Sequence, residues 1–168
     1  MYFLNFIVYA FSFLIPRKKN RWLFGCGFGY CDNPKYLYLD VANNNPEIDS
    51  WWVTKDKSET KRLNEKGVRV VYYRSFRGLY LALTAKVYVY SHHTVDINFF
   101  TSGNSFKVNL FHGIALKVVE WGINKESANY VWFDGTLKSR FHYPANYEKH
   151  DLLLVPGELC LNHYIQMI

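Results

Sequence analysis

The sequence lacks the features that mark secreted and metal-binding proteins. It has three cysteines, Cys26, Cys31 and Cys160, and an odd number does not form a closed disulfide framework. No basic residue precedes the apolar run at the start of the chain, so the usual pattern of a secretory signal peptide is missing. We therefore expect reduced cysteines in the cytosol. No second close pair of ligands follows Cys26 and Cys31, and we expect no metal site and no cofactor.

The sequence also lacks an apolar run long enough to cross a bilayer. The run YFLNFIVYAFSFLI ends at residue 15, whereas a spanning helix needs about 20 apolar residues. The basic cluster PRKKNR follows directly, and cations beside an apolar helix suit anionic lipid headgroups. We expect residues 1–19 to be a peripheral membrane-associating segment on the cytoplasmic face of the cell membrane. The alternative is a first helix that packs on protein.

The size and charge of the chain fit one domain with an anionic partner. Its 168 residues are 49% apolar, which is enough for one core but too little for two full domains. The net charge of +6 favours phosphates, nucleic acid or an anionic membrane. No base-stacking motif or clustered recognition helix supports nucleic acid, and we expect none as a partner.

Short β-prone runs alternate with helical stretches, as is typical of a parallel sheet in an α/β protein. Several runs are apolar at successive positions, which is expected where helices cover both faces of the sheet. We predict helices over 33–44 and 57–67, and an α/β, Rossmann-like domain over 20–168. The predicted strands are 21–25, 49–54, 68–73, 86–91, 106–111, 129–133 and 151–155.

Ligands of such sheets bind beyond the carboxyl ends of the strands, so the residues there are the candidates. The stretch GCGFGY places glycines at 25, 27 and 29, either for close approach to a ligand or for a plain tight turn. The stretch SHHTVD follows another strand, and at most one of its two histidines faces a shared site. Thr54 ends a third predicted strand, and Lys55 follows it.

His112 is the most informative of these residues. Gly113 follows it, and the next residues, IALKVVEWG, are predicted to form a helix whose amino terminus attracts phosphate. A neutral imidazole there can act as a general base on a hydroxyl. The alternative from spacing alone is a histidine whose bonds are satisfied at a strand end.

Three stretches in order resemble the amino-terminal half of the CDP-glycerol glycerophosphotransferase family, which includes teichoic-acid and capsule polymerases. The resemblance is strongest at DNPKYL, SFRGLYLALTAKVYVYS and VNLFHGIALK. Phe111 and Ala115 stand where the family typically has tryptophan and proline. The resemblance implies a GT-B architecture, in which two Rossmann-like domains face each other and the first holds the acceptor.

The implied reaction transfers glycerol phosphate, or a related alditol phosphate, from a CDP-alditol donor to a hydroxyl of an anionic, lipid-linked teichoic-acid or capsule polymer. His112 matches the family's motif histidine, which is the proposed base. We expect the substrate to be bound by Gly25, Gly27, Asp32, Asn33, Ser91, His92, Gly113 and Lys117.

The resemblance also implies a carboxyl-terminal nucleotide-binding domain that this chain lacks, so we expect little transferase activity from the chain alone. Two other functions fit the same architecture. One is a GT-B glycosyltransferase that uses a nucleotide sugar. The other is a non-catalytic, membrane-associated fragment that binds anionic polymer.

Overall fold

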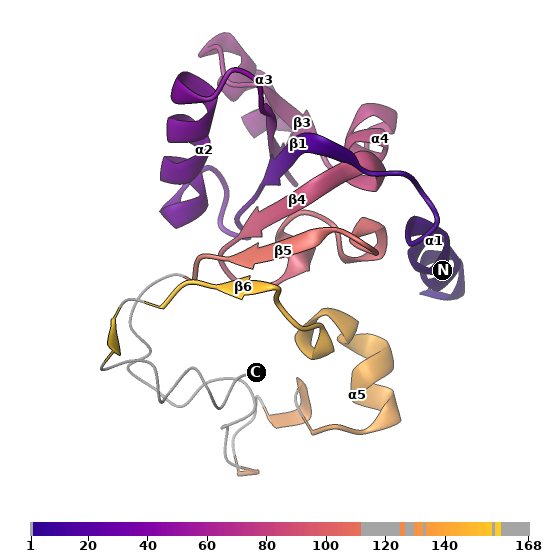
Figure 1. Cartoon of the computed structure of the whole chain (residues 1–168). Coiled ribbons are helices and arrows are strands. Elements are labelled where there is room, and N and C mark those ends of the chain that lie inside the picture. Colours follow the sequence, from indigo (N-terminus) through magenta and orange to yellow (C-terminus); the bar gives the residue numbers. More distant parts are fainter. Residues whose placement is uncertain (1, 112–124, 127–129, 133, 156, 159–168) are drawn as a thin grey trace.

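The computed structural model describes residues 2–111, 125–126, 130–132, 134–155 and 157–158. A parallel sheet of six strands, in the order β3-β2-β1-β4-β5-β6, forms the centre of the molecule (Figure 1). This is the strand order of a Rossmann fold. The strands are β1 (Lys18–Phe24), β2 (Asp49–Thr54), β3 (Val70–Tyr72), β4 (Ala85–Tyr90), β5 (Phe106–Asn109) and β6 (Leu152–Leu153).

Helices cover both faces of the sheet. Figure 1 shows α2 and α3 on one side, and α4 on the other side with α1 beyond it. The helices are α1 (Tyr2–Ser12), α2 (Asp32–Asn44), α3 (Lys57–Glu65), α4 (Phe76–Thr84) and α5 (Leu137–His142). Short 3-10 helices are η1 (Thr94–Asp96), η2 (Phe99–Thr101), η4 (Tyr130–Trp132) and η5 (Pro144–Tyr147).

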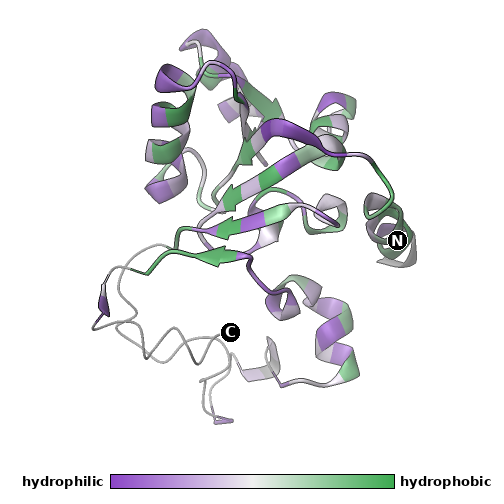
Figure 2. Cartoon of the chain, viewed as in Figure 1, coloured by the Kyte–Doolittle hydropathy of each residue, from purple (hydrophilic) through white to green (hydrophobic). Residues whose placement is uncertain are grey.

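Each face of the sheet has its own core, because neighbouring residues of a strand point to opposite faces. In Figure 2, β1 begins with hydrophilic residues and ends with hydrophobic ones, where it enters these cores. One core contains Phe24, Cys26, Tyr38, Val41, Trp52, Leu63, Val70, Val87, Val89, Val108 and Leu110. The other contains Leu23, Trp51, Val53, Val71, Leu81, Ala82, Ala85, Tyr88, Tyr90 and Ile97.

Side-chain caps fix where three helices begin. The Asp56 carboxylate accepts a hydrogen bond from the Ser58 N–H at the start of α3, at 2.7 Å. Ser75 accepts one from Gly78 at the start of α4, and Thr136 caps α5 in the same way. Such caps satisfy main-chain donors that have no partner within the helix.

The predicted architecture is confirmed, with one strand wrong. Six predicted runs contain strands, although the last is reduced to β6. The run at 129–133 is not a strand in its described part, since Tyr130–Trp132 form a 3-10 helix. Short aromatic runs do not distinguish strand from helix, and β6 already occupies the edge beside β5. Helices α4 and α5 were not predicted, and the helix expected after His112 lies outside the described residues.

Helix α1 packs on the protein through one side. The Tyr9 ring stacks on Phe99 with centroids 4.6 Å apart, and the Phe6 ring stacks on Phe141 at 5.0 Å. Ser12 is fully buried and accepts a hydrogen bond from the Gly103 N–H. None of the helices in the described ranges has the length and apolar composition needed to span a bilayer. The opposite side of α1 remains exposed, so the packed-helix alternative and a surface role both fit its position.

The guanidinium of Arg17 joins α1 to the rest of the domain. It donates hydrogen bonds to the carbonyl oxygens of Ser12, Ala82, Ala85, Thr101 and Gly103. These oxygens belong to five different segments, from the end of α1 to the loop after η2. A planar cation with five donors suits such a cluster, and burial of the group lowers the pKa of Arg17.

Replacement of Arg17 by methionine should therefore destabilise the chain. Arg17→Met keeps an apolar stem but leaves several carbonyl oxygens without donors, and we expect a loss of about 3 kcal/mol in the free energy of unfolding. Urea unfolding measures this loss. Lys19→Met, at an exposed position in the same segment, is the matched control and should change little. Equal stabilities of the two variants would contradict the role of Arg17.

Candidate functional site

The carboxyl ends of β1 and β4 meet at the point where the strand order of the sheet reverses. Strands β2 and β3 lie on one side of β1, and β4, β5 and β6 lie on the other. Open α/β sheets bind ligands in the crevice at this switch point. The loop after β1 begins with Gly25, and the loop after β4 begins with Ser91. Both loops were named as candidates from the sequence, because each follows a predicted strand.

A buried carboxylate connects these two loops. The Asp96 carboxylate accepts hydrogen bonds from the N–H groups of Ser91 and His92, and lies 3.3 Å from Nδ1 of His92. On its other side, a Cβ atom on Gly27 would lie 2.9 Å from Oδ1 of Asp96. A Cβ on Gly25 would meet the Asp96 carbonyl oxygen at the same distance. A side chain at Gly25 would therefore meet the main chain of the η1 segment, whereas one at Gly27 would press on the hydrogen-bonded Asp96 carboxylate.

Asn33 holds the main chain next to His112. Its amide nitrogen donates to the carbonyl oxygens of Leu110, at 3.2 Å, and Phe111, at 2.8 Å. Phe111 has a φ of 47°, in the left-handed region that bulky residues rarely adopt. The predicted substrate residue Asn33 therefore has a described partner in the protein, and the chain directly before His112 is constrained.

Asn109 constrains the same segment from the other side. Its Oδ1 accepts a hydrogen bond from the Phe111 N–H at 2.9 Å, and its Nδ2 donates to the His92 carbonyl oxygen at 2.9 Å. Nδ2 also lies 3.2 Å from Nε2 of His150, and Nδ1 of His150 lies 2.8 Å from the Tyr90 hydroxyl. Because Nδ2 of Asn109 is a donor, Nε2 of His150 must accept, which requires a neutral imidazole.

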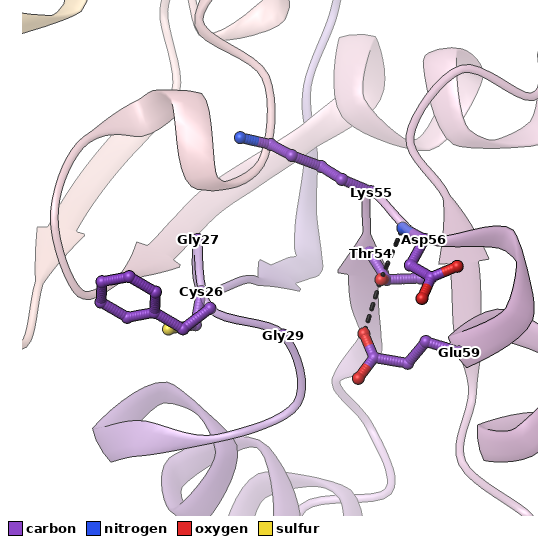
Figure 3. A pocket seen from close by; sticks show the side chains of 8 residues that line it. Cys26, Gly27, Gly29, Thr54, Lys55, Asp56 and Glu59 are labelled. Atoms are coloured by element: carbon purple, nitrogen blue, oxygen red, sulfur yellow. Dashed lines mark hydrogen bonds between the residues drawn. The ribbon is translucent and has the colours of Figure 1, made fainter.

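A cavity of about 310 Å³ opens beside the loop after β1 (Figure 3). Its wall on one side is Cys26–Gly29, and on the other it consists of the end of β2 and the start of α3. Burial raises the pKa of the Cys26 thiol to about 11, so this thiol stays protonated at neutral pH. The described residues contain no cluster of three or more potential metal ligands.

The structure brings some of the predicted substrate residues together and buries others. Gly27 is exposed, and the His92 ring meets the exposed Phe28 ring edge-on, with centroids 4.9 Å apart. Gly25 and Ser91 are buried, so they lie beneath the molecular surface at this edge of the sheet. Asp32, with φ of 63°, begins α2 next to Asn33. His112, Gly113 and Lys117 lie outside the described residues.

Four residues of this region were not identified from the sequence: Asp96, Asn109, His150 and Glu59. Asp96 lies within the SHHTVD stretch, and its spacing after a strand end was the available signal. His150 lies 41 residues after Asn109, and nothing local in the sequence indicates that the two side chains meet.

The half-buried His150 should make stability depend on pH. Desolvation, followed by repulsion from Lys107, lowers the pKa of His150 below 6.5, while Asp151 opposes this. The unfolded chain therefore binds this proton at a higher pH than the folded chain. The stability that the neutral ring provides is present above pH 6.5 and is lost as the pH falls from there toward the folded pKa.

Urea unfolding at a series of pH values measures this effect. We expect the free energy of unfolding to fall more steeply on acidification in the wild type than in His150→Gln. His142→Gln, on the exposed side of α5, is the control and should follow the wild type. If the free energy of unfolding of His150→Gln varied with pH in the same way as that of the wild type, the lowered pKa of His150 would not be the cause of the pH dependence.

Comparison with known proteins gives both a family and a structural likeness. The family model described as CDP-Glycerol:Poly(glycerophosphate) glycerophosphotransferase matches residues 7–164. A search of curated proteins found no match. Among solved structures, the chain resembles the wall teichoic acid polymerase TagF, with 18% identity, a TM-score of 0.68 and 97% of this chain covered.

A histidine-to-asparagine variant of TagF soaked with CDPG gives 17% identity and a TM-score of 0.69. The present chain covers 41% of that structure and 40% of the unmodified TagF. It therefore spans about two fifths of the length of these solved proteins, and the likeness shows the fold. Since the family model covers most of the sequence, this chain belongs to the CDP-glycerol:poly(glycerophosphate) glycerophosphotransferase family.

Proposed function

We propose that this chain provides the acceptor side of a transferase that adds glycerol phosphate to a teichoic-acid polymer. A terminal hydroxyl of the polymer attacks the glycerol-bearing phosphorus of CDP-glycerol. A bond forms between the hydroxyl oxygen and that phosphorus, and the bond from the phosphorus to the bridging oxygen breaks. CMP leaves with the bridging oxygen, and the polymer becomes longer by one glycerol phosphate unit.

The observation that carries the proposal is the family match over residues 7–164, on a parallel sheet with the strand order of a Rossmann fold. The 17–18% identity to TagF supports the fold only, so donor and polymer remain part of the proposal. A capsule polymer and a related alditol phosphate are chemically equivalent alternatives. Donor binding is assigned in this proposal to a second, nucleotide-binding domain of a GT-B pair.

His112 is the proposed general base, which takes the proton from the attacking hydroxyl. What supports this role is the position of His112 in the sequence, immediately after Phe111. Asn33 and Asn109 hold Phe111 at the carboxyl edge of the sheet, beside the loop that contains His92. A base must be held within hydrogen-bonding distance of the proton it removes, and a fixed main chain contributes to that. Gly113 and Lys117 remain proposed contacts to the phosphates of the substrate.

The role of His112 can be tested in the natural full-length protein that carries this sequence. Membranes with lipid-linked acceptor and radiolabelled CDP-glycerol should yield labelled polymer. We expect His112→Ala to lower the rate about 10²- to 10⁴-fold, which is the usual contribution of general-base catalysis.

His142→Ala, which replaces an exposed histidine of α5, should leave the rate unchanged. An undiminished rate in His112→Ala would refute the proposed base. Transfer from a UDP-sugar, with none from CDP-glycerol, would refute the proposed donor and favour a glycosyltransferase.

We also propose that α1 attaches the domain to an anionic membrane surface on its cytoplasmic face. The side of α1 away from the domain exposes Ile7 and Phe11, and the following turn exposes Phe13 and Leu14. Exposed Lys18 and Lys19 come next in the chain. Apolar side chains beside lysines match the boundary between acyl chains and anionic headgroups.

Sedimentation with lipid vesicles tests this attachment. The double variant Phe11→Ser, Leu14→Ser should bind vesicles rich in anionic lipid about tenfold or more weakly than the wild type, because two apolar side chains no longer leave water. Tyr36→Ser, at an exposed position of α2, is the control. Wild-type binding by the double variant would contradict the proposal.

A further inference from the structure

The cavity beside the loop after β1 has the size of a small-ligand site. Its volume of about 310 Å³ lies at the lower end of the range for ligand pockets, which begins near 300 Å³. It lies where β1 and β2 end, one strand away from the switch point. The exposed Phe28 is part of its wall and contacts His92, so the cavity adjoins the loop after β4.

The two carboxylates of the cavity already have donors from the protein. Glu59 accepts hydrogen bonds from the Tyr30 N–H, at 3.0 Å, and from the Thr54 hydroxyl, at 2.6 Å (Figure 3 draws the latter). Arg62 adds an ion pair to the same carboxylate at 3.2 Å. Asp56 caps α3. These anions are therefore compensated locally and do not repel a further anion as free carboxylates would.

Two donors of the cavity have no partner among the described residues. Lys55 makes no ion pair there, and Figure 3 shows its side chain extending from the end of β2 across toward Gly27. The Gly27 N–H likewise donates to no acceptor in the described part of the chain. The nearby Lys57 differs, since its ammonium lies over the Tyr72 ring at 5.4 Å.

This arrangement combines a cation, a free N–H, carboxylate oxygens and an aromatic wall. An ammonium group and a main-chain N–H bind phosphate oxygens. The carboxylates of Asp56 and Glu59 keep acceptor capacity for hydroxyl groups, since each oxygen accepts more than one hydrogen bond. The exposed ring of Phe28 provides an apolar surface for carbon-bound hydrogens.

We propose that this cavity binds a glycerol phosphate unit of the acceptor polymer, with Lys55 as the phosphate-binding residue. The assignment rests on the proposed function, because the acceptor supplies this ligand chemistry. The phosphate is held by Lys55 and by the Gly27 N–H, and the glycerol hydroxyls face Asp56 and Glu59. The bound unit then lies beside Phe28, whose ring contacts His92 in the loop after β4.

Titration of the 168-residue chain with sn-glycerol 3-phosphate, followed by NMR of the main-chain amides, tests the site. We expect saturating shifts of the Gly27, Phe28 and Lys55 amides. Lys55→Met should weaken binding about tenfold, the effect of losing one charge-assisted hydrogen bond. Lys57→Met is the matched control and should bind as the wild type does.

Absence of saturating shifts at these amides would overturn the proposal, and so would equal binding by the two lysine variants. Glycerol without phosphate should bind more weakly than glycerol 3-phosphate, and equal binding would remove the role of Lys55.

A lipid headgroup offers the same chemistry as a polymer end. Binding of a short glycerol phosphate oligomer that is weakened by Lys55→Met supports the polymer. If Lys55→Met weakened binding to phosphatidylglycerol vesicles but not binding to the oligomer, the assignment of the cavity to the polymer would be wrong.

The outcomes also separate this site from the proposed function. If the full-length protein makes polymer from CDP-glycerol while Lys55→Met leaves the Michaelis constant for the acceptor unchanged, the site is wrong and the function stands. If glycerol 3-phosphate binds through Lys55 but CDP-glycerol is not used, the transferase function is wrong and the site stands as a phosphate-binding site.

Discussion

The buried carboxylate of Asp96 holds the loop after β4 and lies against the loop after β1, at the centre of the carboxyl edge. A buried carboxylate is costly unless donors surround it, and here the N–H groups of Ser91 and His92 point at it. The two glycines after β1 allow that carboxylate and its main chain to approach closely. Gly27 lies against this carboxylate and also lines the neighbouring cavity, so one acidic side chain helps to set the position of that wall.

A second set of contacts continues from this wall to the last described residue before His112. The amide of Asn109 connects the loop after β4 to Phe111, and Asn33 reaches Phe111 from the start of α2. Together they offset the cost of a left-handed conformation at a phenylalanine. The neutral ring of His150 completes the set from the chain before β6.

The sheet could be predicted from the sequence because its central strands are buried on both faces. Runs such as DSWWVT are apolar at successive residues, and this pattern depends little on tertiary context. The error at 129–133 and the absence of a prediction for α4 arise from the same ambiguity, since short aromatic and leucine-rich runs fit either element. Within the site, the positions of predicted strand ends were sufficient to identify four candidate residues, Gly25, Gly27, Lys55 and His92. The contact between Asn109 and His150 could not be predicted in this way, because it depends on how strands far apart in the sequence align.

The hydrogen bonds from Arg17 to five carbonyl oxygens limit how far α1 can move relative to the sheet. If a flexible linker joined α1 to the domain, the sheet could rotate relative to any surface that α1 binds. Here the planar guanidinium of Arg17 connects the end of α1 to the start of β4, so α1 and the sheet keep a fixed relative orientation. Any surface that captures α1 therefore sets the direction in which the ligand-binding edge of the sheet faces.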